Sequence, residues 1–157
     1  MFDIERVRAS WARETAQIDA IVLSMSADLA ARPVRDDGWT TQDLLGHIAT
    51  SAKVFVQFIG SDAPPFGDNV DIHDLNEQQR KRQQQRSWPE VQAYWQRVRD
   101  DVTAFLAAGT NDLGAQPARL PWMPTVQTAG DALRLLILHT KSHREELVRG
   151  TAIAVEE

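Results

Sequence analysis

The stretch WTTQDLLGHIATS (residues 39–51) carries the strongest helix signals in this chain. Thr40 stands three residues before Asp43, which is the spacing of a capping box, where each side chain accepts a hydrogen bond from the other residue's backbone N–H. Trp39 and Leu44 flank that box at the spacing of a hydrophobic staple, which fixes how the chain enters a helix. The stretch therefore predicts a helix whose first turn follows Thr40.

Apolar residues recur at helical spacing on both sides of this stretch, and no segment alternates convincingly as a strand does. Segments rich in glycine and proline, such as ARPVRDDG and GSDAPPFGD, separate the helical runs. Two further capping boxes occur, one in SWPE, which predicts a break in the third helical region, and one at the start of the last helix. The predicted helices cover residues 3–30, 40–59, 71–105 and 128–150.

The connection over residues 107–127 is long and irregular, which is typical of a segment with a function or of a cover over another element. Gly150 is predicted to end the last helix as its C-terminal cap, with the tail TAIAVEE extended beyond it. Four main helices with one long crossover connection indicate an all-α fold, a four-helix bundle. The length predicts a single domain over residues 1–157.

Charge and hydropathy narrow the range of partners. The chain has 17 basic and 22 acidic residues, a formal net charge of −5, which disfavours nucleic acid because its binding proteins present basic surfaces. The one basic cluster, RKRQQQR at residues 80–86, is interpreted as a solvated helix face. No apolar run approaches the roughly 20 residues that span a bilayer, and MFDIERVRAS lacks the apolar core of a signal peptide. No membrane partner is expected, and the expected location is the cytoplasm.

The chain contains no cysteine, which excludes disulfides, thiolate metal ligands and a cysteine nucleophile. Any nucleophile must come from a serine, a threonine, a carboxylate, a metal-bound water or a cosubstrate. A thiol that takes part in a reaction here has to belong to a small molecule.

Three of the four histidines fall at positions of two predicted helices that can face inward. His139 and His143 are four residues apart, so they share one helix face, about 6 Å apart along the axis. His47 shares its side of the second helix with an apolar stripe. Taken singly, each is interpreted most simply as a buried, hydrogen-bonded histidine. Bundles also build metal sites from such positions on facing helices, and three imidazoles leave a coordination position open, as catalytic sites do. Spacing alone leaves both interpretations open.

Two other ionisable residues, His73 and Glu146, bear on this site. His73, at the edge of a loop between Asp71 and Asp74, is interpreted as a solvated histidine outside it. Glu146 lies one turn beyond His143 and can accept the second N–H of that imidazole, as ligating histidines usually require. The commoner role of a glutamate at such a position is solvated surface.

The two histidine segments together resemble the DinB-like superfamily of bacterial four-helix bundles. The family pattern is Trp-Ser/Thr-x-x-Asp-hydrophobic-hydrophobic-x-His on the second helix and His-x-x-x-His on the last. Matching residues here are Trp39, Thr40, Asp43 and His47, then His139 and His143. The middle stretch DIHDLNEQQRKRQQQRSWPEVQ also resembles the N-terminal domain of mycothiol-dependent maleylpyruvate isomerase proteins. The resemblance covers nearly the whole chain.

The resemblance implies a divalent metal, typically zinc or nickel, held by His47, His139 and His143, with water completing its shell. It also implies a homodimer and, in several branches of the family, a low-molecular-weight thiol as cosubstrate. Asn76 and Arg80 are expected at the mouth of a substrate pocket only because the family frame places them there. Trp122, in the long connection, is expected to form part of the pocket wall, with ordinary packing of the loop as the alternative.

The leading functional expectation is a metal-dependent enzyme, a small-thiol-dependent transferase acting on an electrophilic small molecule. A metal held by three histidines keeps its full positive charge and can lower the pKa of bound water or bind a thiol as thiolate. The alternatives are metal-assisted hydrolysis, with Glu146 or Asp43 as the available general acid or base, and a metal- or ligand-binding bundle without turnover. No catalytic residue is assigned from the sequence.

Overall fold

The computed structural model describes residues 1–60, 70–120 and 122–156, with side chains of the last helix described as far as residue 152. All regular elements of this part are helical. They are α1 (Ile4–Val22), α2 (Ala27–Ala30), α3 (Thr41–Gln57), α4 (Ile72–Gln84), α5 (Trp88–Ala108), the 3₁₀ helix η1 (Asn111–Ala115) and α6 (Ala129–Glu156). No helix in these residues is long and apolar enough to cross a bilayer.

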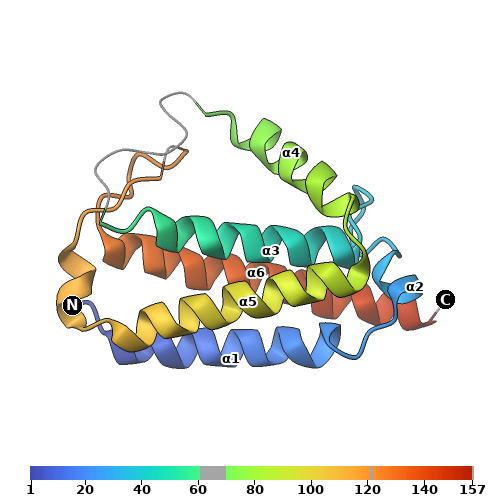
Figure 1. The fold of residues 1–157 in the computed structure, drawn as a ribbon, viewed down its shortest axis with the longest axis horizontal. Coiled ribbons are helices and arrows are strands. Elements are labelled where there is room, and N and C mark those ends of the chain that lie inside the picture. The colour runs from blue at the N-terminus through green and yellow to red at the C-terminus, as the bar shows by residue number, and fades with distance from the viewer. Residues whose placement is uncertain (61–69, 121, 157) are drawn as a thin grey trace.

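The four long helices α1, α3, α5 and α6 lie lengthwise against one another, and α4 leaves them at an angle (Figure 1). Helices α1 and α3 each pack against both α5 and α6, whereas α4 packs against α3. The predicted all-α four-helix bundle is confirmed. A cavity lies between the first turns of α4 and the helices α3 and α6.

The core lies between the four long helices and is apolar apart from a few buried polar groups. Trp11 of α1 and Trp95 of α5 are almost fully buried, and their ring centroids lie 6.3 Å apart. The buried carboxylate of Glu14 accepts a hydrogen bond of 2.9 Å from Nε of Arg144, which ties α1 to α6. This pairing lets a charged side chain sit inside the bundle, where an unpaired charge costs several kcal/mol.

Two of the three capping boxes predicted from the sequence form in full, and the third forms in part. In α3 and in α5 the cap and the third helical residue bind each other's backbone N–H groups in both directions. At the start of α6, Thr128 Oγ1 accepts from the N–H of Asp131 at 3.2 Å and donates to its carboxylate at 3.0 Å. The predicted break at SWPE is also confirmed, because α4 ends at Gln84 and α5 begins at Trp88.

The prediction of one continuous first helix over residues 3–30 is wrong. Helix α1 ends at Val22, and the short helix α2 begins after Ser26, whose hydroxyl accepts from the N–H of Leu29. Side chains of α5 take over the backbone acceptors at the break: Gln92 donates to the carbonyl of Val22 at 2.7 Å and Trp88 to that of Met25 at 2.8 Å. These tertiary bonds compensate for the helical bonds that the break removes.

The prediction that the last helix ends at Gly150 with an extended tail is also wrong, because α6 continues to Glu156. Gly150 serves a different purpose. A Cβ atom at this position would lie 2.4 Å from Cβ of Val34, so the missing side chain allows the loop before α3 to pack directly on α6. That loop carries Arg35 and Asp37 to the edge of the histidine cluster described next.

Candidate metal centre

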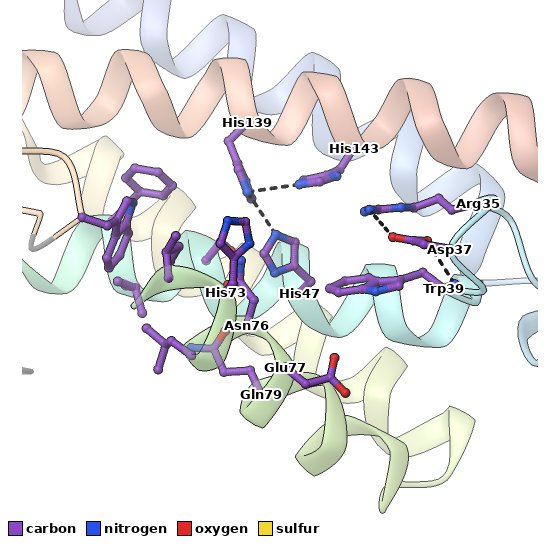
Figure 2. A pocket seen from close by; sticks show the side chains of 16 residues that line it. Arg35, Asp37, Trp39, His47, His73, Asn76, Glu77, Gln79, His139 and His143 are labelled. Atoms are coloured by element: carbon purple, nitrogen blue, oxygen red, sulfur yellow. Dashed lines mark hydrogen bonds and ion pairs between the residues drawn. The ribbon is translucent and has the colours of Figure 1, made fainter. Parts of the chain in front are cut away.

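Three imidazoles from two helices meet at the base of the space between α4 and the bundle. His47 lies in the second turn of α3, and His139 and His143 lie on one face of α6 (Figure 2). Nε2 of His139 is 3.1 Å from Nε2 of His47 and 3.1 Å from Nε2 of His143. One nitrogen from each ring falls within 4.8 Å of the others. The structure thus brings together the three histidines singled out by their spacing.

Glu146 fixes the tautomer of the outermost imidazole. Its Oε2 lies 2.7 Å from Nδ1 of His143, so the proton of a neutral His143 ring sits on Nδ1 and is donated to the carboxylate. The lone pair of Nε2 is then directed at the other two rings. This is the arrangement in which a carboxylate orients a metal-ligating histidine, and the contact expected for Glu146 is present.

Burial keeps the other two imidazoles unprotonated. Burial lowers the pKa of His47 to about 2, with smaller effects from the neighbouring His139, His143 and Arg35. Burial likewise lowers the pKa of His139 to about 3, helped by His143. Both rings are therefore neutral at ordinary pH, which is the state in which imidazole binds a metal ion.

The nitrogen atoms of the cluster fit a divalent cation better than they fit one another. Nε2 of His139 faces Nε2 of both His47 and His143, and a single N–H on His139 could serve only one of these two acceptors. Tetrahedral coordination with bonds of about 2.1 Å separates ligand nitrogens by about 3.4 Å, close to the two 3.1 Å separations here. An ion among them would satisfy three lone pairs at once, so the donor set fits a transition metal.

Aromatic and charged side chains surround the cluster. The ring of Trp39 meets that of His47 edge to face, with centroids 5.5 Å apart, and Phe55 lies 5.8 Å from His139. Arg35 stacks on Trp39 at 4.8 Å and has Nη1 3.7 Å from the Glu146 carboxylate. Through Arg35, the loop before α3 thus contacts both Trp39, which packs on His47, and Glu146, which binds His143.

A cavity of about 580 Å³ opens above the histidines, a volume suited to a small molecule (Figure 2). Three of its walls come from α3, α4 and α6, and its lining is both apolar and polar. The lining residues are Arg35, Asp37, Trp39, His47, Ser51, Val54, Phe55, Ile72, His73, Leu75, Asn76, Glu77, Gln79, Trp122, His139 and His143.

The residues expected to bind substrate separate into two groups. Asn76 and Trp122 both line the cavity. Arg80 is not among the lining residues: its Nε lies 3.3 Å from the buried carboxylate of Asp43, and its guanidinium stands over the ring of Trp39 at 5.3 Å. Asp43 in turn accepts from the side chain of Gln84 at 3.1 Å. Asp43 and Arg80 therefore join α4 to α3 beneath the cavity wall.

His73 was interpreted from the sequence as a solvated histidine outside the site, and the structure shows it to be exposed but also part of the cavity lining. The sequence held one signal for this position. His73 precedes Asn76 by three residues, so the two share one face of a helix. The choice between solvent and cavity depended on the angle of α4, which local sequence does not determine.

A sequence model of the DinB superfamily matches residues 5–147, so the chain belongs to the DinB superfamily. Among solved structures it is similar to YfiT from Bacillus subtilis, described as a probable metal-dependent hydrolase with an unusual four-helix bundle topology. That likeness has a TM-score of 0.73 at 20% sequence identity and covers 95% of this chain and 86% of YfiT. It shows a shared fold. No functionally curated protein sequence matches the chain significantly.

Proposed function

We propose that this protein is a divalent-metal-dependent enzyme in which His47, His139 and His143 hold a zinc or nickel ion. The observation that carries the proposal is the meeting of three imidazoles, with one nitrogen of each within 4.8 Å of the others, at a cavity large enough for a small substrate. A metal ion bound there would supply a Lewis acid that makes coordinated water or thiol nucleophilic at neutral pH. We propose a small thiol as the nucleophile and an electrophilic small molecule as the substrate.

The chain's own residues prepare this chemistry in several ways. Glu146 holds the proton of His143 on Nδ1, and the apolar surroundings of His47 and His139 keep those rings unprotonated. Trp39 and Phe55 shield the cluster on its flanks, so nucleophile and substrate approach it from the cavity. Asn76 and Trp122, which line that cavity, would position a substrate within it.

Hydrolysis with water as nucleophile is the second candidate. It is favoured by the similarity to YfiT, which is described as a probable metal-dependent hydrolase. Glu146 and Asp43, the two carboxylates expected from the sequence as general acid or base, already bind other groups of the protein. Glu146 binds His143 and stands near Arg35, and Asp43 caps α3 and binds α4.

The cobalt(II)-substituted protein distinguishes the two candidates. Addition of 2-mercaptoethanol should alter the visible absorption of the cobalt centre if a thiol binds it, and single-turnover reaction with an electrophile should then require the thiol. His143→Ala serves as the control that lacks a ligand. A spectrum indifferent to thiol, together with slow ester hydrolysis, would assign the hydrolase. Cobalt retention without either reaction would leave a binding protein.

A further inference from the structure

We propose that His73 is a catalytic residue that donates a proton to the leaving group of the substrate, opposite the three-histidine cluster. The inference rests on the proposed function, because it needs a nucleophile at the cluster. It assigns the fourth histidine of the chain a role of its own and leaves metal binding to the other three.

The position of His73 is set by the first turn of α4. Asp71 caps this helix and accepts from the backbone N–H of His73 at 2.8 Å. The imidazole points from α4 into the cavity, whose other walls carry His47 and His139 (Figure 2). His73 is also exposed, so protons can exchange between its ring and solvent.

Helix α4 is fixed to the bundle at its other end. Gln83 packs so closely on α3 that a Cβ atom at Gly46 would lie 2.5 Å from its Cγ. The side chain of Gln84 and the guanidinium of Arg80 both bind the buried carboxylate of Asp43, at 3.1 and 3.3 Å. A helix held at one end in this way carries His73 at a defined place over the cavity.

The other acidic groups in the lining have partners of opposite charge. The carboxylate of Asp37 lies 2.7 Å from Nη2 of Arg35, and that of Glu77 lies 3.6 Å from Nη1 of Arg80. The ring of His73 has no hydrogen-bond or ion-pair partner among the described residues. Apart from the three clustered histidines, His73 is therefore the histidine of the described lining, and both of its ring nitrogens are available to a substrate. Histidine is also the commonest general acid in enzymes.

The proton transfer balances for an ester substrate with either nucleophile. Water or thiol forms a bond to the carbonyl carbon, and the bond between that carbon and the leaving oxygen breaks, with its electron pair passing to the oxygen. The protonated imidazole of His73 gives its proton to this oxygen, which leaves as an alcohol. The proton lost by the nucleophile passes to solvent, and solvent returns one to the imidazole. No oxidant or reductant is needed.

The first test varies the leaving group in zinc-loaded protein. His73→Gln retains the backbone N–H that Asp71 caps, and Lys81→Gln is the matched control on an exposed part of α4 outside the lining. An alkyl ester needs protonation of its alkoxide, whereas p-nitrophenolate leaves unaided. His73→Gln should lose about 10²- to 10⁴-fold in alkyl ester turnover, keep p-nitrophenyl ester turnover, and keep the metal content of the wild type. Lys81→Gln should match the wild type in all three.

The second test does not depend on turnover. Diethyl pyrocarbonate modifies accessible histidine and lysine side chains, and peptide mass spectrometry reports the rate at each residue. Acetohydroxamate, a chelating occupant of a zinc-loaded cavity, should slow modification of His73 several-fold and leave Lys81 unchanged. The same comparison in His143→Ala, without a complete ligand set, should show no protection.

The outcomes separate the two proposals. Equal loss of both esters, equal retention of both, or unprotected His73 in protein that holds zinc would overturn the role of His73 while the metal centre stands. Loss of zinc in His73→Gln would make the residue a fourth ligand and would also overturn it. Absence of zinc from the wild type would instead refute the proposed function, and the acid role of His73 with it.

Discussion

At the scale of single residues, a neutral imidazole has one nitrogen that donates and one that accepts, so the partner of one nitrogen determines what the other can do. His143 is the clearest case, because Glu146 takes the Nδ1 proton and leaves Nε2 free to accept a cation. Nothing comparable holds Nδ1 of His47 or His139 within the described part of the chain. The orientation of those two rings depends on packing by Trp39 and Phe55.

Replacing Glu146 with Gln should weaken metal binding without removing a ligand. The amide cannot accept the imidazole proton with the strength of a carboxylate, and such outer contacts are worth about 10- to 100-fold in affinity. Competition for zinc against a chelating dye measures the change. Glu145→Gln is the matched control, since the neighbouring Glu145 pairs with Arg144, at 3.7 Å, rather than with a histidine of the cluster. Equal affinity in wild type and both variants would show that Glu146 does not support the site.

The buried histidines should make the metal-free protein sensitive to acid. Burial lowers the pKa of His47 to about 2 and of His139 to about 3, whereas histidines of the unfolded chain titrate near pH 6.5. Between these values the unfolded state binds more protons, so the free energy of unfolding falls as pH drops below about 6.5, by up to about 1.4 kcal/mol per pH unit for each histidine. Urea unfolding after treatment with EDTA measures this dependence.

His47→Gln removes one of these titrating groups and is the comparison that isolates the effect. Its free energy of unfolding should fall less steeply with acid than that of the wild type, by up to about 1.4 kcal/mol per pH unit. Parallel pH profiles for the two proteins would mean that His47 is accessible to protons in the folded state.

Several contacts of the candidate site could be predicted from the sequence because they depend only on the spacing of residues within one helix. The pair His139 and His143 shares a helix face at four residues, and Glu146 follows at three, so their contacts arise within α6 alone. Joining His47 to them required the assumption that α3 and α6 face each other. The positions of Arg80 and His73 depend on the angle of α4 to the bundle, which no local pattern in the chain specifies.

At the scale of elements, the packing of α4 on α3 determines the shape of the cavity. Gln83 is buried although it lies in the run RKRQQQR, which was expected to be a solvated face, and most of that run is exposed. The contact requires a residue without a side chain at Gly46, next to His47. The amide of Gln42 adds bonds to the backbone carbonyls of Gln83 and Arg86 at 3.3 and 2.8 Å.

Gly46→Ala should destabilise the protein even though alanine favours a helix by about 1 kcal/mol over glycine. The new Cβ would lie 2.5 Å from Cγ and 3.0 Å from Cβ of Gln83. Rotation of that buried side chain would move Cγ but leave the tight contact with Cβ, so it cannot relieve the clash completely. We expect a loss of about 1–3 kcal/mol in the free energy of unfolding, as for other overpacked contacts.

A double-mutant cycle with Gln83→Ala tests whether this contact is the cause. The second substitution removes Cγ and Cδ of Gln83, the two closest atoms, and leaves Cβ at 3.0 Å. Gly46→Ala should therefore cost less in the Gln83→Ala background than in the wild type. Urea unfolding of the four proteins gives the interaction energy. Additive effects of the two substitutions would show that α4 does not sit on Gly46 in solution.

The boundaries of the elements were predicted well where capping side chains mark them and poorly where tertiary contacts decide. Thr40 and Ser87 mark the starts of α3 and α5 in the sequence itself. The break after Val22 is stabilised by donors from α5, far away in the sequence. Gly150 has the appearance of a helix end, yet its role is contact with Val34.

At the scale of the whole molecule, the all-α bundle was predictable because helical periodicity runs through nearly the entire chain, while strand alternation does not. The family resemblance added the order of the motifs, and the match to the DinB superfamily over residues 5–147 confirms it. The departure of α4 from the bundle axis was not predicted. A cavity lined by residues of α3, α4 and α6 lies between α4, which leaves the bundle at an angle (Figure 1), and the histidine cluster.

The family resemblance also predicts a homodimer. Sedimentation equilibrium of the purified chain should then give twice the 17.6 kDa of one chain at micromolar concentration. Light scattering over a dilution series provides an independent check on the mass. A mass of one chain across the series would contradict this prediction and would leave the proposed metal site, whose three histidines belong to one chain, unaffected.

The central claim is that three histidines hold one metal ion, and elemental analysis of tag-free protein reconstituted with zinc or nickel tests it most directly. The wild type should retain about one equivalent after gel filtration, as expected for a three-histidine site. His47→Ala and His143→Ala should lose it, and His73→Gln should keep it. A wild type that retains no metal, or His47→Ala and His143→Ala variants that retain as much as the wild type, would contradict the account.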